Sequence, residues 1–362
     1  MRILFITNSL ERDNGGGVFS RQVIEGLTRR LGAHTTIFTV VSSDDTETIP
    51  IGFSMFGILK TLWRIRREAK QSDVMHVIDV FPYGILGALA IIGLRKKFIL
   101  TAVGSASIIP LHQIRYAFLA RWCLRRADAV VAISSFTRDE ILKVIPALHI
   151  EVINPGIELS EFERSTGIFT QVAQHQPYLL SVGTVRWRKG YRTSVAVFAK
   201  TAPQFPKLHY IIIGRHPWPS FVEELKSTAR AGGVEDRLIF LDSVNTREEL
   251  LEWYRGAELF CLFSENAQND VEGFGIVFTE AAAAGLPVVG RKHCGVDDAV
   301  DDGKNGILVD TPEDFEKALN TLLSEKALAL RMGAESLNWA QKFSVDAKIQ
   351  AYSECYRRLG IS

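Results

Sequence analysis

The sequence has few cysteines and no surplus of charge of either sign. The cysteines, Cys123, Cys261, Cys294 and Cys355, form no C-x-x-C pair, and two of them lie in apolar runs. Neither a zinc site nor a disulfide framework is expected, and a reduced, cytoplasmic location fits best. Lys and Arg number 42 against 41 Asp and Glu, so the formal net charge is +1. A large nucleic-acid interface needs surplus cations to neutralise phosphates and is therefore not expected.

Long hydrophobic runs are also missing. The first residues form an apolar run that is too short for the hydrophobic region of a signal peptide, and it breaks at Glu11–Asp13. The longest apolar stretch, Val80 to Leu94, contains Pro82 and falls short of the roughly 20 residues that a membrane-spanning helix needs. We therefore expect this stretch to form a buried helix.

What the sequence does contain is an alternation of strand and helix patterns over 362 residues, a length that favours two domains. In the first half, strands are predicted at Ile3–Thr7, Thr35–Val41, Val74–Ile78, Phe98–Ala102, Ala129–Ile133 and Glu151–Ile153. Helices are predicted at Phe19–Leu31, Ser54–Lys70, Tyr83–Leu94, Ile114–Arg126 and Thr137–Val144. Strands that alternate with helices pair in parallel, which predicts a doubly wound α/β sheet.

The alternation pauses at the polar stretch Glu161–Pro177 and then starts again at Tyr178–Val182. We place the first domain at residues 1–163, a linker at 164–177 and the second domain at 178–344. The chain is thus predicted to form two Rossmann-like, doubly wound α/β domains facing across a cleft. Ligands of such sheets bind beyond the carboxyl ends of the strands, so the cleft is the expected site.

Two common nucleotide-binding motifs are absent. G-x-G-x-x-G follows neither leading strand, and no P-loop ending in G-K-[ST] occurs, so a hydride-transferring dehydrogenase is disfavoured. The segment Asn14–Val18 after the first strand instead contains Gly16 and Gly17. Their backbone can approach a ligand at the start of a helix, where negative charge is favoured.

A basic turn follows the first strand of the second domain. Between Gly183 and Gly190 it carries three cations, Arg186, Arg188 and Lys189. A basic turn at the carboxyl end of a strand can hold a diphosphate through charge-assisted hydrogen bonds. Solvated surface charge is the alternative interpretation.

Two glutamates, Glu272 and Glu280, stand eight residues apart across a glycine-rich turn that leads into a predicted helix at Val277–Ala284. Helical spacing would separate them by about 12 Å along the axis. Retaining glycosidases that use two carboxylates hold them about 5 Å apart, so this pair suits an elongated ligand held at two points better than double displacement on one carbon. Backbone N–H groups near Gly275 and Ile276 point out of the helix start and favour negative charge there.

With these motifs the chain resembles family 4 of the retaining glycosyltransferases, which have the GT-B fold, over nearly its whole length. Glu272 and Glu280 match the E-x7-E signature, and Lys189 matches the lysine that binds the donor phosphate. The resemblance implies that Glu272 contacts hydroxyls of the donor sugar and Glu280 the ribose. Further matches are the glycines by the phosphates at Gly16–Gly17, the turn Asn154–Glu158, Gly295, Asn305–Gly306, Val309 and the C-terminal helix Val345–Leu359, which in the family returns to the first domain.

The resemblance assigns a role to each domain and to each site residue. Residues 1–163 with the helix at 345–362 form the acceptor side, and residues 178–344 bind the nucleotide-sugar donor. The predicted catalytic residues are Glu272, Lys189 and Arg186. The predicted donor-binding residues are Gly16, Gly17, Gly183, Arg188, Phe274, Gly275, Ile276 and Glu280.

Three positions depart from the family pattern. Thr184 stands where the family usually has arginine, so Arg186 or Arg188 supplies that cation. Val103–Gly104 stands where the family often has His-Gly in contact with the reacting sugar, and Asp298 replaces the favoured glutamate. His76 is no obvious substitute, because a lone histidine by an apolar strand is more often structural.

The resemblance implies a front-face substitution with retention, in which the leaving phosphate helps to deprotonate the acceptor hydroxyl. Positive charge on Lys189 and a neighbouring arginine would stabilise that phosphate. No Asp-x-Asp occurs, so we expect metal independence and no cofactor beyond the nucleotide diphosphate sugar as co-substrate. Lys189→Ala should lower nucleoside diphosphate affinity with little change in fold stability.

The acceptor is expected to be a glycan, a lipid-linked molecule or a small molecule. Phe53–Lys70 and Ile114–Arg126 are basic, aromatic-bearing helical patterns that can lie in a bilayer interface, as peripheral association with the inner face of the membrane would require. The alternative is two helices packed on the sheet with solvated outer faces.

Two other functions stay open. The chain could be a GT-B relative such as a nucleotide-sugar epimerase or a phosphorylase, which donor turnover without an acceptor would favour. It could also be a catalytically silent nucleotide-sugar-binding protein, because Val103 replaces the usual histidine of the family. Nucleotide binding without sugar release would favour this alternative.

Overall fold

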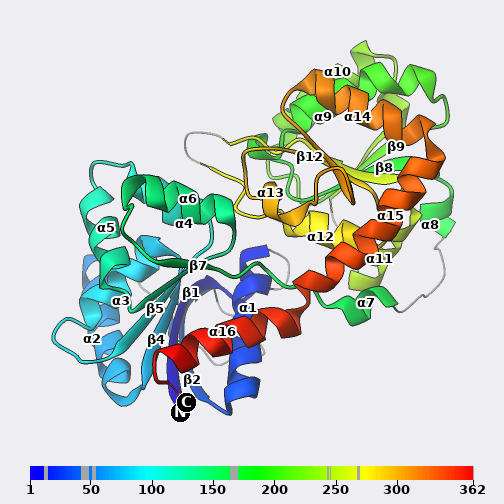
Figure 1. Ribbon diagram of the computed structural model, residues 1–362. Coiled ribbons are helices and arrows are strands. Elements are labelled where there is room, and N and C mark those ends of the chain that lie inside the picture. The colour runs from blue at the N-terminus through cyan, green and yellow to red at the C-terminus, as the bar shows by residue number, and fades with distance from the viewer. Residues whose placement is uncertain are drawn as a thin grey trace. The chain divides into compact units, whose positions relative to one another are not determined.

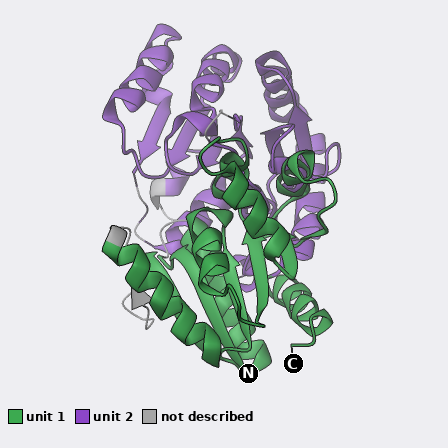
Figure 2. Ribbon diagram, turned by 90° about the vertical axis from the view of Figure 1, so that its left-hand side faces the viewer, with its two compact units in different colours: residues 1–156, 345–362 green, residues 157–344 purple. Residues whose placement is uncertain are grey.

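The computed structural model describes residues 1–11, 15–41, 49–50, 54–163, 170–242, 244, 246–266 and 270–361. Asn14 and the first part of the predicted linker lie outside the described residues. The chain forms two compact units, coloured separately in Figure 2: unit 1 contains Met1–Gly156 and Val345–Ser362, and unit 2 contains Ile157–Ser344.

Unit 1 is built on a parallel, seven-stranded sheet in the order β3-β2-β1-β4-β5-β6-β7. The strands are β1 Arg2–Ser9, β2 His34–Val41, β3 Ile49–Pro50, β4 Val74–Ile78, β5 Lys97–Ala102, β6 Ala129–Ala132 and β7 Ile150–Val152. The α-helices are α1 Gly15–Leu31, α2 Met55–Gln71, α3 Ile85–Ala90, α4 Ser105–Ile108, α5 Ala117–Arg126, α6 Ser135–Val144 and α16 Val345–Arg358. Helices α2, α3 and α5 pack side by side on one face of the sheet, and α1 with α16 on the other (Figure 1).

Unit 2 contains a parallel, six-stranded sheet in the order β10-β9-β8-β11-β12-β13. Its strands are β8 Tyr178–Val182, β9 His209–Ile213, β10 Leu238–Leu241, β11 Leu259–Leu262, β12 Val288–Arg291 and β13 Gly306–Val309. Its α-helices are α7 Leu159–Glu163, α8 Thr170–Ala173, α9 Tyr191–Thr201, α10 Pro219–Ala231, α11 Arg247–Gly256, α12 Ile276–Ala283, α13 Val296–Ala299, α14 Pro312–Ser324 and α15 Lys326–Ala340. Helices α9, α10 and α14 pack together above the sheet in Figure 1, and α12 packs against α15 below it.

The central strands of both sheets are mostly apolar and are buried along their whole length. Every residue of β4, β8 and β11 is buried, because helices cover both faces of each sheet. The chain order reverses between β1 and β4 in unit 1, and between β8 and β11 in unit 2. These are the switch points at whose carboxyl edges open α/β sheets bind ligands. The predicted doubly wound α/β sheets are therefore confirmed.

The boundary between the units lies earlier than the predicted end of the first domain at residue 163. Ile157 already belongs to unit 2, where its N–H donates to the Phe343 carbonyl at 2.7 Å and it forms a bridge with Ser344. The predicted linker 164–177 is also partly structured, because α8 begins at Thr170 and contacts α11. The polar sequence predicted where the alternation of strands and helices pauses. The boundary between the units is instead set by the backbone pairing of Ile157 with the distant segment Phe343–Ser344.

The predicted buried helix at Tyr83–Leu94 is shorter than expected. A π-helical turn at Val80–Gly84 precedes α3, and Ile92, beyond the end of α3, is 53% exposed. Among the described residues, no helix is both long enough and apolar enough to cross a bilayer.

The C-terminal helix α16 is joined to the sheet of unit 1 by a buried polar group, His76. Its Nδ1 lies 2.8 Å from the Tyr356 hydroxyl, and its Nε2 lies 2.8 Å from the Thr101 hydroxyl. Burial lowers the pKa of His76 to about 3. Since an unfolded histidine takes up a proton near pH 6.5, the neutral imidazole stabilises the fold above that pH and its contribution is lost as pH falls toward 3. His76 is thus a structural histidine.

We predict that Tyr356→Phe lowers the free energy of unfolding by about 1–3 kcal/mol, because a buried imidazole nitrogen loses its partner. Tyr116→Phe is the matched control, since the Tyr116 hydroxyl makes no hydrogen bond to any described residue. Denaturant unfolding of both variants measures the difference. Equal stabilities would mean that the bond to His76 contributes nothing to the docking of α16.

Candidate functional site

The basic turn of unit 2 is a tight connection between β8 and α9. Gly183 has a φ of 141°, and its carbonyl accepts a hydrogen bond from the Tyr191 hydroxyl at 2.9 Å. Gly190 has a φ of 64°, and a Cβ there would lie 1.6 Å from the Phe263 carbonyl oxygen. The turn can therefore pass the end of β11 only with glycine at position 190. This close approach places Arg188 and Lys189 beside the segment that follows β11.

Glu272 lies at the centre of this cluster and is 6% exposed. Its Oε2 lies 2.7 Å from Lys189 Nζ and 2.7 Å from Arg188 Nη1. Burial by itself would raise the pKa of the Glu272 carboxyl, but attraction and hydrogen bonds from Lys189 and Arg188 outweigh it and hold that pKa at about 2. Burial lowers the pKa of Lys189, and Glu272 opposes this effect. Glu272 is thus an ionised carboxylate shared by two cations.

Asp270 is a member of the cluster that the sequence analysis missed. Its Oδ2 lies 2.9 Å from Arg188 Nε and 3.2 Å from Arg186 Nη1. Arg186 and Arg188 therefore both face Asp270, whereas Glu272 pairs with Arg188 and Lys189. Three cations on one turn require neutralisation by acidic side chains. The position of Asp270 two residues before Glu272 was the signal in the sequence that could have identified it. The cluster carries three positive and two negative groups, a net charge of +1.

Glu280 lies on α12 with a different set of partners. Its Oε1 lies 2.8 Å from Arg247 Nη1, and its Oε2 accepts a hydrogen bond from the Tyr254 hydroxyl at 3.0 Å. Arg247 also pairs with Glu161 of α7 at 2.9 Å. Both Arg247 and Tyr254 come from α11 and were missed in the sequence. Because the two glutamates have separate partners, they occupy distinct positions in unit 2.

The glycine-rich turn between the glutamates has one residue in the left-handed region. Gly275 has a φ of 82° and precedes the first residue of α12, Ile276. Phe274 is 2% exposed and packs against Phe343 with ring centroids 5.7 Å apart. Its side chain belongs to the core, and the assignment of Phe274 to the donor site stays a prediction.

The remaining predicted residues, Gly16 and Gly17, belong to unit 1. They lie in the first turn of α1, where Gly16 is exposed and Gly17 is buried. A Cβ on Gly17 would lie 2.1 Å from the Glu11 carbonyl oxygen, so close packing of the chain requires glycine there. The structure thus gathers Arg186, Arg188, Lys189 and Glu272 into one cluster in unit 2, while these two glycines belong to the other unit.

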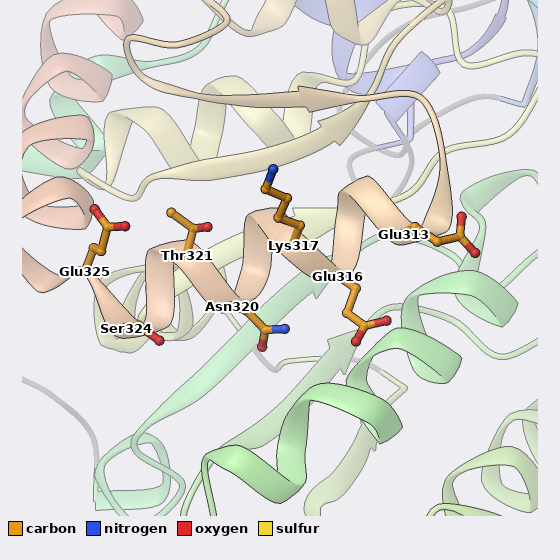
Figure 3. Close-up of a pocket in the computed structure, with 7 residues that line it drawn as sticks. All are labelled: Glu313, Glu316, Lys317, Asn320, Thr321, Ser324 and Glu325. Carbon is orange, nitrogen blue, oxygen red and sulfur yellow. The ribbon is translucent and has the colours of Figure 1, made fainter.

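A surface hollow in unit 2 lies apart from this cluster. It is lined by Glu313, Glu316, Lys317, Asn320, Thr321, Ser324 and Glu325. Figure 3 shows these side chains along α14 and the residue that follows it. None of the predicted site residues lines this hollow. Among the described residues there is also no group of three or more His, Cys, Asp and Glu side chains that could hold a metal ion.

Comparison with known proteins gives matches over both units. The family model described as "Glycosyl transferases group 1" matches residues 168–339, and "Glycosyltransferase Family 4" matches residues 14–161. The chain is 28% identical over 370 residues to a GDP-mannose-dependent alpha-(1-6)-phosphatidylinositol monomannoside mannosyltransferase of Mycobacterium tuberculosis, covering 93% of each chain. It is 31% identical over 225 residues to a D-inositol 3-phosphate glycosyltransferase of Corynebacterium glutamicum, covering 60% of this chain and 51% of that protein.

Two solved structures resemble the chain over nearly its whole length. HepE of Anabaena in complex with UDP matches with a TM-score of 0.83 and 19% identity, covering 99% of this chain and 100% of that one. A sucrose-phosphate synthase of Thermosynechococcus elongatus matches with a TM-score of 0.80 and 20% identity, covering 99% and 98%. At these identities the likeness concerns the fold.

The ion pair changes the expectation that Lys189→Ala leaves stability nearly unchanged. We predict a loss of about 1–3 kcal/mol at pH 7, because Glu272 keeps Arg188 alone as its cation. The pKa of Glu272 is lowered in the folded protein, so its stabilisation is present above about pH 4.5 and is lost as pH falls toward 2. The difference between wild type and variant should therefore shrink over that interval.

Denaturant unfolding at pH 7 and at pH 3 measures this effect. Lys200→Ala is the control, because Lys200 is an exposed lysine 3.9 Å from Glu316 and its loss should change stability by less than about 0.5 kcal/mol. A variant at position 189 no less stable than this control would show that the pair with Glu272 contributes no net stability.

Proposed function

Because this chain belongs to the family 4 glycosyltransferases, with two Rossmann-like domains of the GT-B fold, we propose that it transfers a hexosyl group from a nucleotide diphosphate sugar to an acceptor hydroxyl with retention of configuration. The protein is a glycosyltransferase.

The observation that carries the proposal is the buried cluster at the carboxyl end of β8. Lys189 and Arg188 are held by Glu272 and Asp270 in a position where they need not reorganise to meet an anion. The net charge of +1 leaves the cluster able to accept a diphosphate. Cations that are positioned in advance stabilise the charge that develops on a leaving phosphate as the glycosidic bond breaks.

The two glutamates fit the two ends of an elongated donor. We assign Glu272 to the sugar, because it sits among the cations that would receive the phosphate next to the sugar. We assign Glu280 to the ribose, because its partners Arg247 and Tyr254 form a separate group. Positive charge from Arg186, Arg188 and Lys189 takes the place of a metal ion in this scheme, so addition of a chelator should leave the rate unchanged.

The relatives suggest where to look for donor and acceptor. Their names contain GDP-mannose, phosphatidylinositol monomannoside and D-inositol 3-phosphate, and a matched structure holds UDP. We propose that this chain uses a GDP- or UDP-hexose and an acceptor that carries hydroxyls next to a phosphate, either linked to a lipid or free.

Mass spectrometry of the product, with NMR for its anomeric configuration, tests the proposal directly. Each donor is incubated with each acceptor, and the product is examined for a mass gain of one hexose and for its anomeric configuration. Donor turnover without any glycosylated product would support an epimerase or a phosphorylase, and binding without turnover a silent binding protein. Either result would overturn the proposed transfer.

The same assay separates the glutamates. Glu280→Gln should weaken binding of the free nucleoside diphosphate and of the nucleotide sugar alike, because both contain the ribose. Glu272→Gln should spare nucleoside diphosphate binding but lower the transfer rate about ten- to a hundredfold, the range of one hydrogen bond to a charged group. Calorimetry gives the affinities. The assignment is reversed if Glu272→Gln weakens nucleotide binding as much as Glu280→Gln and leaves turnover intact.

Unit 1 presents an apolar and basic surface suited to a membrane. On α2, Phe56 is 79% exposed, Leu59 61% and Trp63 62%. Lys60 and Arg67 lie on the same exposed face, and the Arg67 guanidinium is 5.2 Å from the Trp63 ring centre. The helix carries five basic residues and one acidic residue, a net charge of +4. Lipid-facing aromatics flanked by cations are typical of helices that lie in an anionic interface.

A second helix repeats this composition. Ile114, just before α5, is 98% exposed, and Phe118 on α5 is 78% exposed, with Arg115 and Arg125 also exposed. Both α2 and α5 pack against α3, so they are neighbours on one side of unit 1. We therefore propose peripheral binding of this surface to anionic lipid.

Flotation with anionic vesicles tests this surface. Wild type should co-float at low salt and less at high salt, and the double variant Phe56→Ser, Trp63→Ser should lose most of the bound fraction. Leu330→Ser is the matched control, because Leu330 is 76% exposed on α15 of unit 2. The surface has no such role if wild type fails to float at low salt or if the control loses as much as the double variant.

A further inference from the structure

Asp79, directly after β4 in unit 1, has a backbone conformation that a residue with a side chain rarely adopts. Its φ is 75° and its ψ is 147°. This combination lies close to a region of backbone conformation that is populated almost entirely by glycine. A residue with a side chain is destabilising there and keeps the conformation only because the surrounding structure holds it. Such strain is concentrated at functional positions. A carboxylate at a position that favours glycine therefore indicates a function for the side chain.

One oxygen of the carboxylate is held firmly. Asp79 Oδ1 accepts hydrogen bonds from the Ser107 hydroxyl at 2.9 Å and from the Val103 N–H at 3.2 Å. The Asp79 N–H donates to the Thr101 carbonyl at 2.8 Å, which ties the residue to β5. By contrast, Oδ2 accepts no hydrogen bond from any residue that the structure describes. The carboxylate is thus oriented through one oxygen while the other is available.

The position of Asp79 is that of a ligand-binding residue. It follows β4, and Val103 follows β5, the neighbouring strand. On the other side, Asn8 near the end of β1 accepts a hydrogen bond from the Tyr83 hydroxyl at 2.6 Å. Strands β1, β4 and β5 are adjacent, and the order of the sheet reverses between β1 and β4. Asp79 therefore stands at the carboxyl edge of the sheet, at its switch point, where such folds bind ligands.

No cation is among the described groups that shift the pKa of the Asp79 carboxyl. Burial raises the pKa of Asp79 to about 6, opposed by the hydrogen bonds from Ser107 and Val103. Burial first, and then the negative charge of Asp79, raise the pKa of the Tyr83 hydroxyl to about 12. A buried acceptor of hydrogen bonds without a cation nearby is suited to a neutral donor such as a hydroxyl.

We propose that Asp79 binds the acceptor hydroxyl through Oδ2 and orients it for transfer, so that Val103 at the usual histidine position leaves no gap in the acceptor site. This inference rests on the proposed function. In the transfer, the hydroxyl oxygen forms the bond to the anomeric carbon as the bond from that carbon to the phosphate oxygen breaks. The hydroxyl proton passes to the leaving diphosphate, and Asp79 ends unchanged.

The test compares Asp79→Asn with Asp73→Asn, a matched aspartate just before β4 at the opposite edge of the sheet, where it accepts from the Arg2 N–H at 2.8 Å. Asp79→Asn should lower kcat/KM for the acceptor about ten- to a hundredfold, while nucleoside diphosphate affinity and acceptor-independent donor hydrolysis stay unchanged. Wild-type transfer should fall as pH drops through about 6, and this fall should be absent in Asp79→Asn. Asp73→Asn should transfer like wild type.

A second variant separates binding from structure. Asp79→Gly relieves the strained φ but also removes the acceptor of the hydrogen bonds from Ser107 and Val103, so transfer should fall as in Asp79→Asn while nucleoside diphosphate affinity stays unchanged. The inference is overturned if Asp79→Asn transfers like wild type, or if donor hydrolysis falls together with transfer, since that would show a structural role. If wild type glycosylates no acceptor at all, the proposed function fails first and the inference falls with it, before any variant is compared.

Discussion

The site in unit 2 depends on one buried interaction, the sharing of the Glu272 carboxylate between Lys189 and Arg188. A lysine as buried as this one would lose its charge without a partner, and a buried carboxylate would take up a proton. Each keeps the other ionised, and Asp270 forms ion pairs with Arg188 and Arg186. A basic side chain that binds a phosphate must be ionised and already in position, and this arrangement meets both requirements.

The ion cluster is possible because two chain segments approach each other closely. Gly190 allows the basic turn to touch the backbone after β11, and Asp270 and Glu272, farther along the chain, pair with the cations of the turn. The Glu265 N–H donates to the Arg188 carbonyl at 2.7 Å, which ties the two segments together through their backbones. This backbone contact fixes where Arg188 leaves the turn. Positioning of this kind is what electrostatic stabilisation of a leaving group requires.

Unit 1 uses the same sheet edge with different chemistry. There the carboxyl ends of β1, β4 and β5 carry Asn8, Asp79 and Val103, and no cation of the described part of the chain is among the groups that shift the pKa of the Asp79 carboxyl. Unit 2 places positive charge at its switch point and unit 1 places a hydrogen-bond acceptor there. Under the proposed function, the positive charge suits the diphosphate of the sugar donor, and the hydrogen-bond acceptor suits the hydroxyl group that receives the sugar.

The alternation of β-branched runs with amphipathic segments was enough to predict two doubly wound sheets, because strand and helix periodicities are local properties of the chain. The basic turn and the acidic pair were visible for the same reason, since their residues are close in sequence. Which cation meets which acid was not visible: Arg186, left as an alternative to Arg188, faces Asp270, and the partners of Glu280 come from α11. The boundary at Gly156 and the strained φ of Asp79 were also decided by tertiary structure. Each depends on segments far apart in the chain, and only the packed sheet brings such segments within hydrogen-bonding distance.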